Sequence, residues 1–119
     1  FRARQIANEV LTEAIAKAPA LPGGMAGLRN GPADAWRHAR WNQRMINEVG
    51  YCPALVAGVG HEVENLFQGS PLSEILMDLH NNAVGRTGEN PDSLLLRREL
   101  RIIAPGFTNE GKGWYPWRN

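Results

Sequence analysis

Three short segments concentrate the residues that could carry chemistry. Residues 77–86 have the sequence MDLHNNAVGR and place an acid, an imidazole, two amides and a guanidinium close together. Residues 34–42 (DAWRHARWN) and 61–65 (HEVEN) hold the other two histidines, beside further carboxylates. Because none of the three histidines lies outside these segments, we expect them to converge on one site that the rest of the chain positions.

The segment 34–42 suits a histidine that is held in a fixed orientation. Asp34, His38 and Asn42 are four residues apart, so they share one face of a helix. An aspartate one turn before a histidine can orient its ring and fix its tautomer, which favours a general base or a metal ligand. The alternative is a buried histidine that a nearby carboxylate simply caps.

The segment 61–65 places a carboxylate among apolar residues. Glu62 falls on the same predicted helix face as Leu55, Val59 and Leu66. A carboxylate there is costly unless it is paired, hydrogen-bonded or bound to a metal. Position 65 is Asn, so this is not the H-E-x-x-H motif and no zinc protease is predicted. The alternative for Glu62 is an ion pair with an arginine at position 37, 40, 44 or 86.

The segment 77–86 combines candidate ligands with a candidate anion-binding group. Asp78 and Asn82 share a helix face, whereas His80 turns toward Leu76 and Val84 and joins Asp78 only if the helix loosens near Asn81. Arg86 suits bidentate binding of phosphate or carboxylate. In the alternative interpretation the asparagines and Gly85 end the helix and Arg86 pairs with Asp78.

These segments give three sets of candidate site residues. The predicted catalytic residues are His38, Glu62, Asp78 and His80. A hydrolytic divalent metal ion needs N or O ligands and an open position for water, and its predicted ligands are His38, His61, Asp78 and His80. The predicted substrate-binding residues are Arg37, Asn81, Asn82 and Arg86.

Composition limits the class of protein. The 119 residues, 43% hydrophobic and 21% charged, suit one folded domain. A net charge of +1 gives no indication of nucleic acid binding, and no apolar run approaches the roughly 20 residues of a membrane span. The single cysteine, Cys52, cannot form an internal disulfide. Because the chain opens at Phe1 without an initiator Met, we expect residues 1–119 to be a domain cut from a longer polypeptide.

Hydrophobic periodicity predicts an all-α fold of about five helices. The expected helices are 2–17, 32–49, 53–67 and a fourth from Ser70 to Asn82 or Gly85. Pro91 opens a fifth helix, whose apolar positions are Leu94, Leu95, Leu96, Leu100 and Ile103. The expected inward positions include Leu55, Val59, Val63 and Leu66 on the third helix and Leu72, Ile75, Leu76 and Leu79 on the fourth. Residues 105–119 lack periodicity and are expected to form an irregular aromatic tail.

Together the three segments resemble a bacterial domain family with the pattern DAxRHAxWN, then HE, then MDLHNNxxGR, here at residues 34–42, 61–62 and 77–86. Such domains look like C-terminal modules of secreted or antibacterial toxin-type proteins. The resemblance implies a helical enzyme domain that is secreted or delivered into a target cell, with a cognate immunity protein as a partner. The resemblance does not supply a reaction. From the histidines and carboxylates of the three segments we expect a hydrolase, with or without a metal. The arginines at positions 37, 40 and 44 and at 97, 98 and 101 suggest an anionic, phosphate-bearing substrate.

Two other functions remain open at this point. In a hydrolase of the cell wall, acting on peptidoglycan or a lipid-linked precursor, Glu62 and Asp78 would be the acid and base. In a non-catalytic binding module the polar cluster would be a buried network that fixes the helix packing.

Overall fold

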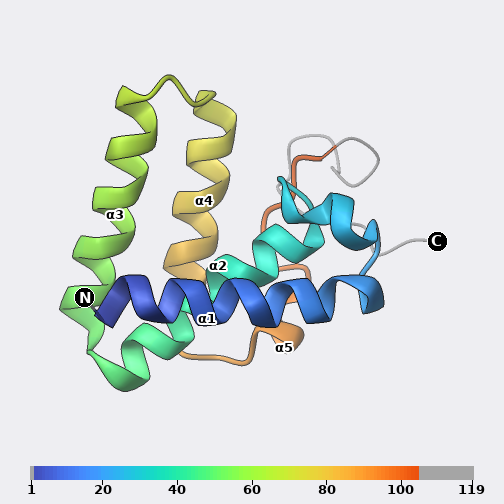
Figure 1. Ribbon diagram of the computed structural model, residues 1–119, viewed down its shortest axis with the longest axis horizontal. Helices are drawn as coiled ribbons and strands as arrows, with labels where there is room; N and C mark the ends of the chain where they lie inside the picture. The colour runs from blue at the N-terminus through green and yellow to red at the C-terminus, as the bar shows by residue number, and fades with distance from the viewer. Residues whose placement is uncertain (1, 105–119) are drawn as a thin grey trace.

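The computed structural model describes residues 2–104, which form an all-α fold as predicted (Figure 1). No strand occurs within that range. The five α-helices are α1 (Arg2–Lys17), α2 (Pro32–Glu48), α3 (Tyr51–Phe67), α4 (Leu72–Gly85) and α5 (Pro91–Leu96). Two short 3₁₀ turns, η1 (Ala18–Ala20) and η2 (Gly24–Leu28), connect α1 to α2. The predicted aromatic tail lies outside the described residues. None of the described helices has the length and apolar character needed to span a bilayer.

The helix α2 is the centre of the fold, because it packs against α1, α3, α4 and α5. The helices α3 and α4 stand side by side as an antiparallel hairpin that rises from the layer formed by α1 and α2 (Figure 1). Each side chain that α2 presents on its inner faces can therefore meet a residue from a distant part of the sequence.

Local sequence signals explain where α2 starts and stops. Pro32 lies in its first turn, where a missing N–H costs nothing, and the acidic Asp34 complements the positive end of the helix dipole. The helix ends at Glu48, and the chain then turns at Gly50, whose φ of 119° is one that glycine tolerates far better than other residues.

Small side chains in the core let α2 and α4 approach closely. Ala35 and Ala39 of α2 are fully buried, together with Met77 of α4. At Gly85 a Cβ atom would lie only 2.9 Å from the Cα atom of Ala39 and 2.9 Å from the Cβ atom of Asn42. The glycine is therefore required for α4 to cross α2 at this distance.

The predicted inner face of α3 is wrong. Val59, Val63 and Leu66 are exposed, whereas Ala54, Gly58 and Glu62 are the buried residues of this helix. The prediction followed hydrophobicity, but α3 meets its neighbours through its smallest residues because these allow the backbones to come close. Glu62 is buried as predicted, among small residues rather than large apolar ones.

The fourth and fifth helices also differ from the prediction. Ile75 of α4 is buried as predicted, but Leu72 and Leu76 are exposed, Met77 is buried, and Ser70 does not cap the helix. The helix α5 ends at Leu96, and the chain continues as coil from which Leu100 and Ile102 enter the core. The reason for the short α5 is that Arg98 adopts a left-handed φ of 60°, which a continuing helix does not allow.

Candidate functional site

The centre of the site is His38, one helical turn after Asp34 on α2. The Nδ1 atom of His38 lies 3.1 Å from Oδ1 of Asp34 and 3.0 Å from the carbonyl oxygen of the same residue. Oδ1 of Asp34 also accepts a 2.9 Å hydrogen bond from Arg37, and Oδ2 accepts a 2.8 Å bond from the backbone N–H of Asn30. With both oxygens held, the Asp34 carboxylate fixes the imidazole orientation and favours a proton on Nδ1.

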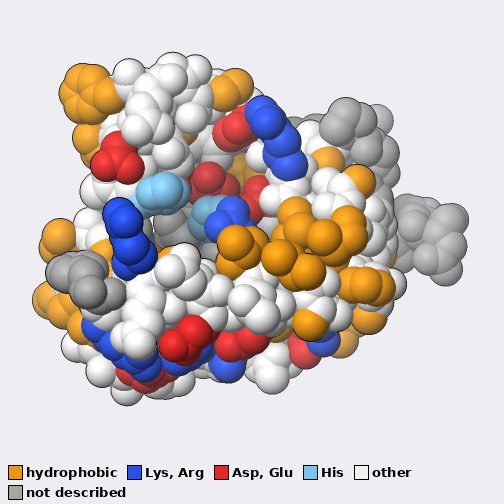
Figure 2. Space-filling model, in the orientation of Figure 1, with side chains coloured by type: hydrophobic (Ala, Val, Ile, Leu, Met, Phe, Trp, Pro, Cys, Tyr) orange, Lys and Arg blue, Asp and Glu red, His pale blue; other side chains and the backbone are white. Residues whose placement is uncertain are grey.

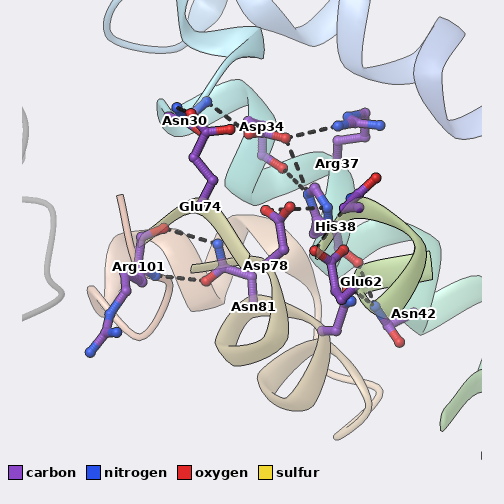
Figure 3. Close-up of polar contacts among 12 residues, drawn as sticks. Asn30, Asp34, Arg37, His38, Asn42, Glu62, Glu74, Asp78, Asn81 and Arg101 are labelled. Carbon is purple, nitrogen blue, oxygen red and sulfur yellow. Dashed lines mark hydrogen bonds and ion pairs between the residues drawn. The ribbon is translucent and has the colours of Figure 1, made fainter. Parts of the chain in front are cut away.

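Two further carboxyl groups face the cluster from α3 and α4 (Figure 3). Oδ1 of Asp78 lies 3.4 Å from Nε2 of His38. The carboxyl group of Glu62 lies beside that of Asp78, its residue is only 2% exposed, and its Oε1 accepts a 3.4 Å bond from Asn65. Oδ1 of Asp78 and Oε2 of Glu62 are buried, and neither accepts a bond from an N–H group of the described residues. The two carboxyl groups share a hydrogen bond with each other, which requires that one of them carries a proton. Three helices thus bring one imidazole and three carboxyl groups together.

The neighbouring charges and the burial shift the pKa of every group in the cluster. Burial alone would raise the pKa of Asp34, but the hydrogen bond and charge of His38, together with the charge of Arg37, lower it to about 2. Burial alone would lower the pKa of His38, but its bond to Asp34 and the charges of Asp34 and Asp78 raise it. Burial, followed by the Asp78 charge, raises the pKa of Glu62 to about 7, and burial also raises the pKa of Asp78.

A cleft of about 550 Å³ lies between α1, α2 and α3 and reaches this cluster. Its apolar wall comes from Trp41 and from small residues of the two outer helices, including Ala7 and Ala57. Its polar lining includes His38, His61, Asn82, Glu64 and two arginines, Arg4 and Arg37. Figure 2 shows this face hollowed between the α3–α4 hairpin and α1, with histidine, acidic and basic side chains gathered around the hollow. His38 therefore belongs both to the buried cluster and to the cleft wall.

Amide groups join the helices beneath the cleft. Nδ2 of Asn42 donates to Oδ1 of Asn82 at 2.8 Å and to the carbonyl oxygen of His38 at 2.9 Å. A Cβ atom on Gly58 would lie 3.4 Å from Nδ2 of Asn82 and 3.7 Å from Nη1 of Arg86. Asn82 therefore lines the cleft, whereas Arg86 is not one of the lining residues and only approaches Gly58.

The structure does not bring the three histidines to one point. His61 is exposed on α3 and lines the cleft. The Nε2 atom of His80 lies 2.8 Å from the carbonyl oxygen of Glu99, because α4 does not loosen at Asn81 but stays helical to Gly85. The predicted convergence of His80 with Asp78 is therefore corrected, and with it the predicted metal set of His38, His61, Asp78 and His80.

Asn81 also lies outside the cleft. It is fully buried, its Oδ1 accepts a 2.7 Å bond from the backbone N–H of Arg101, and its Nδ2 donates 2.9 Å to the carbonyl oxygen of the same residue. With both ends of its amide occupied, Asn81 holds the coil after α5 against α4. The geometry gives it this packing contact in place of the predicted contact with a substrate.

The described residues contain one group that could hold a metal ion, namely Asp34, His38 and Asp78. One ligand atom from each of these residues lies within 4.8 Å of the other two. Asp34 was not one of the predicted ligands. Its spacing of four residues from His38, which places both on one helix face, could have identified it. The contribution of α1 to the cleft, including Arg4, gave no signal because contacts between distant segments are not visible in one sequence.

The comparisons place the chain in a family without supplying a reaction. The profile of a family described as a domain of unknown function (DUF6973) matches residues 2–100, which is most of the chain. No solved structure matches the chain. The match covers α1 to α5 and all three polar segments. The chain therefore belongs to the DUF6973 family.

Proposed function

We propose that this domain is a hydrolase that acts on an anionic, phosphate-bearing substrate bound in the cleft. The proposal rests on the location of His38, which belongs both to the cleft wall and to the buried cluster. The imidazole lines the cleft, where a substrate can reach it, and is surrounded on its buried side by Asp34, Asp78 and Glu62. A titratable group in a cleft with a fixed orientation and nearby proton acceptors is the arrangement that acid–base hydrolysis requires.

The roles of the three carboxyl groups differ. Asp34 orients His38 by holding Nδ1, which leaves Nε2 as the nitrogen that reacts or binds an ion. Asp78 lies next to Nε2, and Glu62, with a pKa near 7, can give up or take a proton close to neutral pH. In this proposal the residues of the cluster activate a water molecule, and a divalent ion held among them would assist.

The cleft lining supports an anionic substrate. Arg4 and Arg37 line the cleft with the carboxylate of Glu64, and Arg37 is also paired with Asp34. Asn82 offers an amide in the cleft, and Arg86, behind Gly58, has a buried Nε with no hydrogen-bond partner among the described residues. Guanidinium and amide donors grouped in this way suit the oxygens of a phosphate ester.

The setting of a secreted antibacterial effector with a cognate immunity protein is also a proposal, and it rests on the resemblance of the three polar segments. Expression in the bacterial cytoplasm and, separately, in the periplasm tests it. Growth arrest that depends on His38 is the expected result, and the compartment in which it occurs indicates where the substrate lies.

The experiment for the activity is a hydrolysis assay with phosphate monoesters, phosphate diesters and phospholipids, and with purified cell-wall sacculi as the competing substrate. We expect His38→Gln to lower the hydrolysis of a phosphate ester by at least about 100-fold. The matched control is His80→Gln, which removes an imidazole from outside the cluster and should leave the rate unchanged. Equal rates for the wild type and His38→Gln would reject the proposal, and hydrolysis of sacculi alone would favour the cell-wall enzyme.

A further inference from the structure

We propose that the α3–α4 hairpin carries an interface for a second copy of this chain, in which two hairpins pack together as a four-helix bundle. The interface is an apolar surface on the side of the hairpin away from the cleft, here called the hairpin face. Its residues are between 40% and 86% exposed, and they are Val59, Val63, Leu66, Phe67, Leu72 and Leu76. The inference concerns association and does not depend on the hydrolase proposed above.

The apolar residues of the two helices belong to one continuous surface. Gly58 and Glu62 mark the contact of α3 with α4, because a Cβ atom on Gly58 would lie 3.4 Å from Nδ2 of Asn82 and the Glu62 carboxyl group lies beside that of Asp78 (Figure 3). On each helix the exposed apolar stripe lies roughly 100° around the axis from these contact residues. Because the two helices run antiparallel (Figure 1), both stripes emerge on the same side of the hairpin.

The cleft lies on the opposite side of α3. His61 and Glu64 line the cleft together with Ala57. Val59 is two positions before His61, which places the two residues about 200° apart around the helix axis. A second copy bound to the hairpin face would therefore leave the cleft open.

The size of the hairpin face suits a protein interface. Its side chains expose on the order of 600 Å², which is at the upper limit of the apolar patches that monomers present to solvent. One partner in a standard protein–protein interface buries about 600–1,000 Å². The hairpin face is therefore large enough to form one half of a stable dimer.

The hairpin face is free of charge. Residues 45–85 contain no Lys or Arg. The four acids of α3 and α4 are directed elsewhere: Glu62 and Asp78 are in the buried cluster, Glu64 lines the cleft, and Glu74 accepts a 3.1 Å hydrogen bond from Asn30. Two copies that meet through this face would bring no like charges together.

These properties favour a second copy over a lipid surface. A hairpin that has acids and no bases is not attracted to anionic lipid headgroups. Homodimer interfaces are more apolar than other interfaces, and charged residues are depleted at their centre. A two-fold dimer uses the same patch on both chains, and two helical hairpins joined by their apolar faces make a four-helix bundle. The hairpin face meets each of these requirements.

The experiment is sedimentation equilibrium of the chain at about 100 µM and at tenfold dilutions below it. The face variants are Val63→Glu and Leu76→Glu, each of which places a charge on the hairpin face. The matched control is Leu11→Glu on α1, which makes the same change at a residue that is 41% exposed, close to the 46% of Val63. Since all three residues are exposed, the substitutions should leave the fold intact, and circular dichroism checks this.

We expect the mass of two chains at about 100 µM for the wild type and for Leu11→Glu. Val63→Glu and Leu76→Glu should each raise the dissociation constant of the dimer by at least about 100-fold, because the interface would bury an unpaired carboxylate. Loss of the dimer in the face variants alone would establish the interface.

Three results would overturn the inference. The first is a wild-type mass of one chain at about 100 µM. The second is a dimer that the face variants do not weaken, or that Leu11→Glu weakens equally. The third is a monomeric wild-type chain that sediments with phosphatidylcholine vesicles and loses this binding in Val63→Glu, which would assign the hairpin face to lipid.

Discussion

Asn42 and Asn82 connect α2 to α4 through a 2.8 Å hydrogen bond from Nδ2 to Oδ1. The same Nδ2 of Asn42 donates to the carbonyl oxygen of His38, so the bond lies one turn from the proposed reacting group. Both asparagines are buried, at 0% and 3% exposure. This contact fixes the register between the helix that carries His38 and the helix that carries Asp78.

Replacing Asn82 by alanine should lower the free energy of unfolding by about 1–3 kcal/mol, because it leaves a buried amide donor of Asn42 with one partner fewer. Urea unfolding measures this change. The control is Asn47→Ala on the exposed side of α2, which should change stability by less than about 0.5 kcal/mol. Equal effects of the two substitutions would show that the bond contributes nothing to stability.

Glu62 should make the metal-free chain less stable as the pH rises. Its pKa is about 7 in the fold against an ordinary value of 4.5, so the folded chain binds the extra proton between these pH values. The free energy of unfolding should therefore fall from about pH 4.5 to about pH 7 and stay lower above. Glu62→Gln cannot ionise, so we expect it to exceed the wild type by about 1–3 kcal/mol at alkaline pH and to converge with it near pH 4.5.

Urea unfolding at several pH values, with chelator present, measures the Glu62 effect. His38 adds a slope of the same sign above its ordinary pKa, because its pKa is also raised in the fold. That slope occurs in both proteins, so the difference between them reports the ionisation of Glu62 together with the change that the substitution causes in its neighbours Asp78 and His38. A difference that does not vary with pH would contradict the prediction.

The Asp34→Asn substitution should lower the pKa of His38. Burial alone lowers this pKa, and the hydrogen bond and charge of Asp34 are the main causes that raise it. An amide removes the charge, so the imidazole should lose its proton at a lower pH than in the wild type. NMR titration of the His38 ring measures the shift, and an unchanged midpoint would show that Asp34 does not govern the charge of the ring.

Gly85→Ala should destabilise the fold by about 1–3 kcal/mol, since its Cβ atom would lie 2.9 Å from the backbone of Ala39. The matched control is Gly60→Ala on α3, where a Cβ atom has nothing within 4 Å. That change should stabilise the chain by roughly 0.5–1 kcal/mol through helix propensity. Thermal unfolding of both variants decides the matter, and a neutral Gly85→Ala would mean that α4 can move away freely.

Gly58→Ala should narrow the cleft while leaving the fold intact. The added Cβ atom would meet Asn82, Arg86 and Trp41 at 3.4–3.7 Å, which are ordinary contact distances. We expect a higher KM for the phosphate ester hydrolysed by the wild type, with thermal stability unchanged or improved. If Gly58→Ala has the wild-type KM, this part of the cleft wall does not contact the substrate.

The parts of the site that local spacing determines were predictable. The spacing of four residues from Asp34 to His38 predicts an orienting pair directly, and the structure places the two residues in contact. The predicted convergence of His80 with Asp78 is wrong. The two residues are two positions apart, which places them about 200° apart around the helix axis, so His80 points away from Asp78 unless the helix breaks. The prediction assumed such a break, and the helix continues to Gly85.

Glu62 shows the limit of periodicity. An apolar stripe predicts its burial, yet Val59 and Val63 of that stripe are exposed and the buried neighbours are Ala54 and Gly58. A prediction from hydrophobicity places large apolar residues in the core, whereas two closely packed helices bury small residues at their contact. The cleft wall from α1 depends on contacts between distant segments, which no local pattern in one sequence records.

The helix α4 crosses α2 at Gly85, a residue without a functional group, so a tilt of α4 would pivot at this crossing. Asp78 lies seven residues before Gly85, which is about 10 Å along the helix axis. A small tilt about the crossing is therefore carried along the helix arm to the carboxylate. The small volume of Gly85 against Ala39 therefore helps to determine the 3.4 Å distance between Oδ1 of Asp78 and Nε2 of His38.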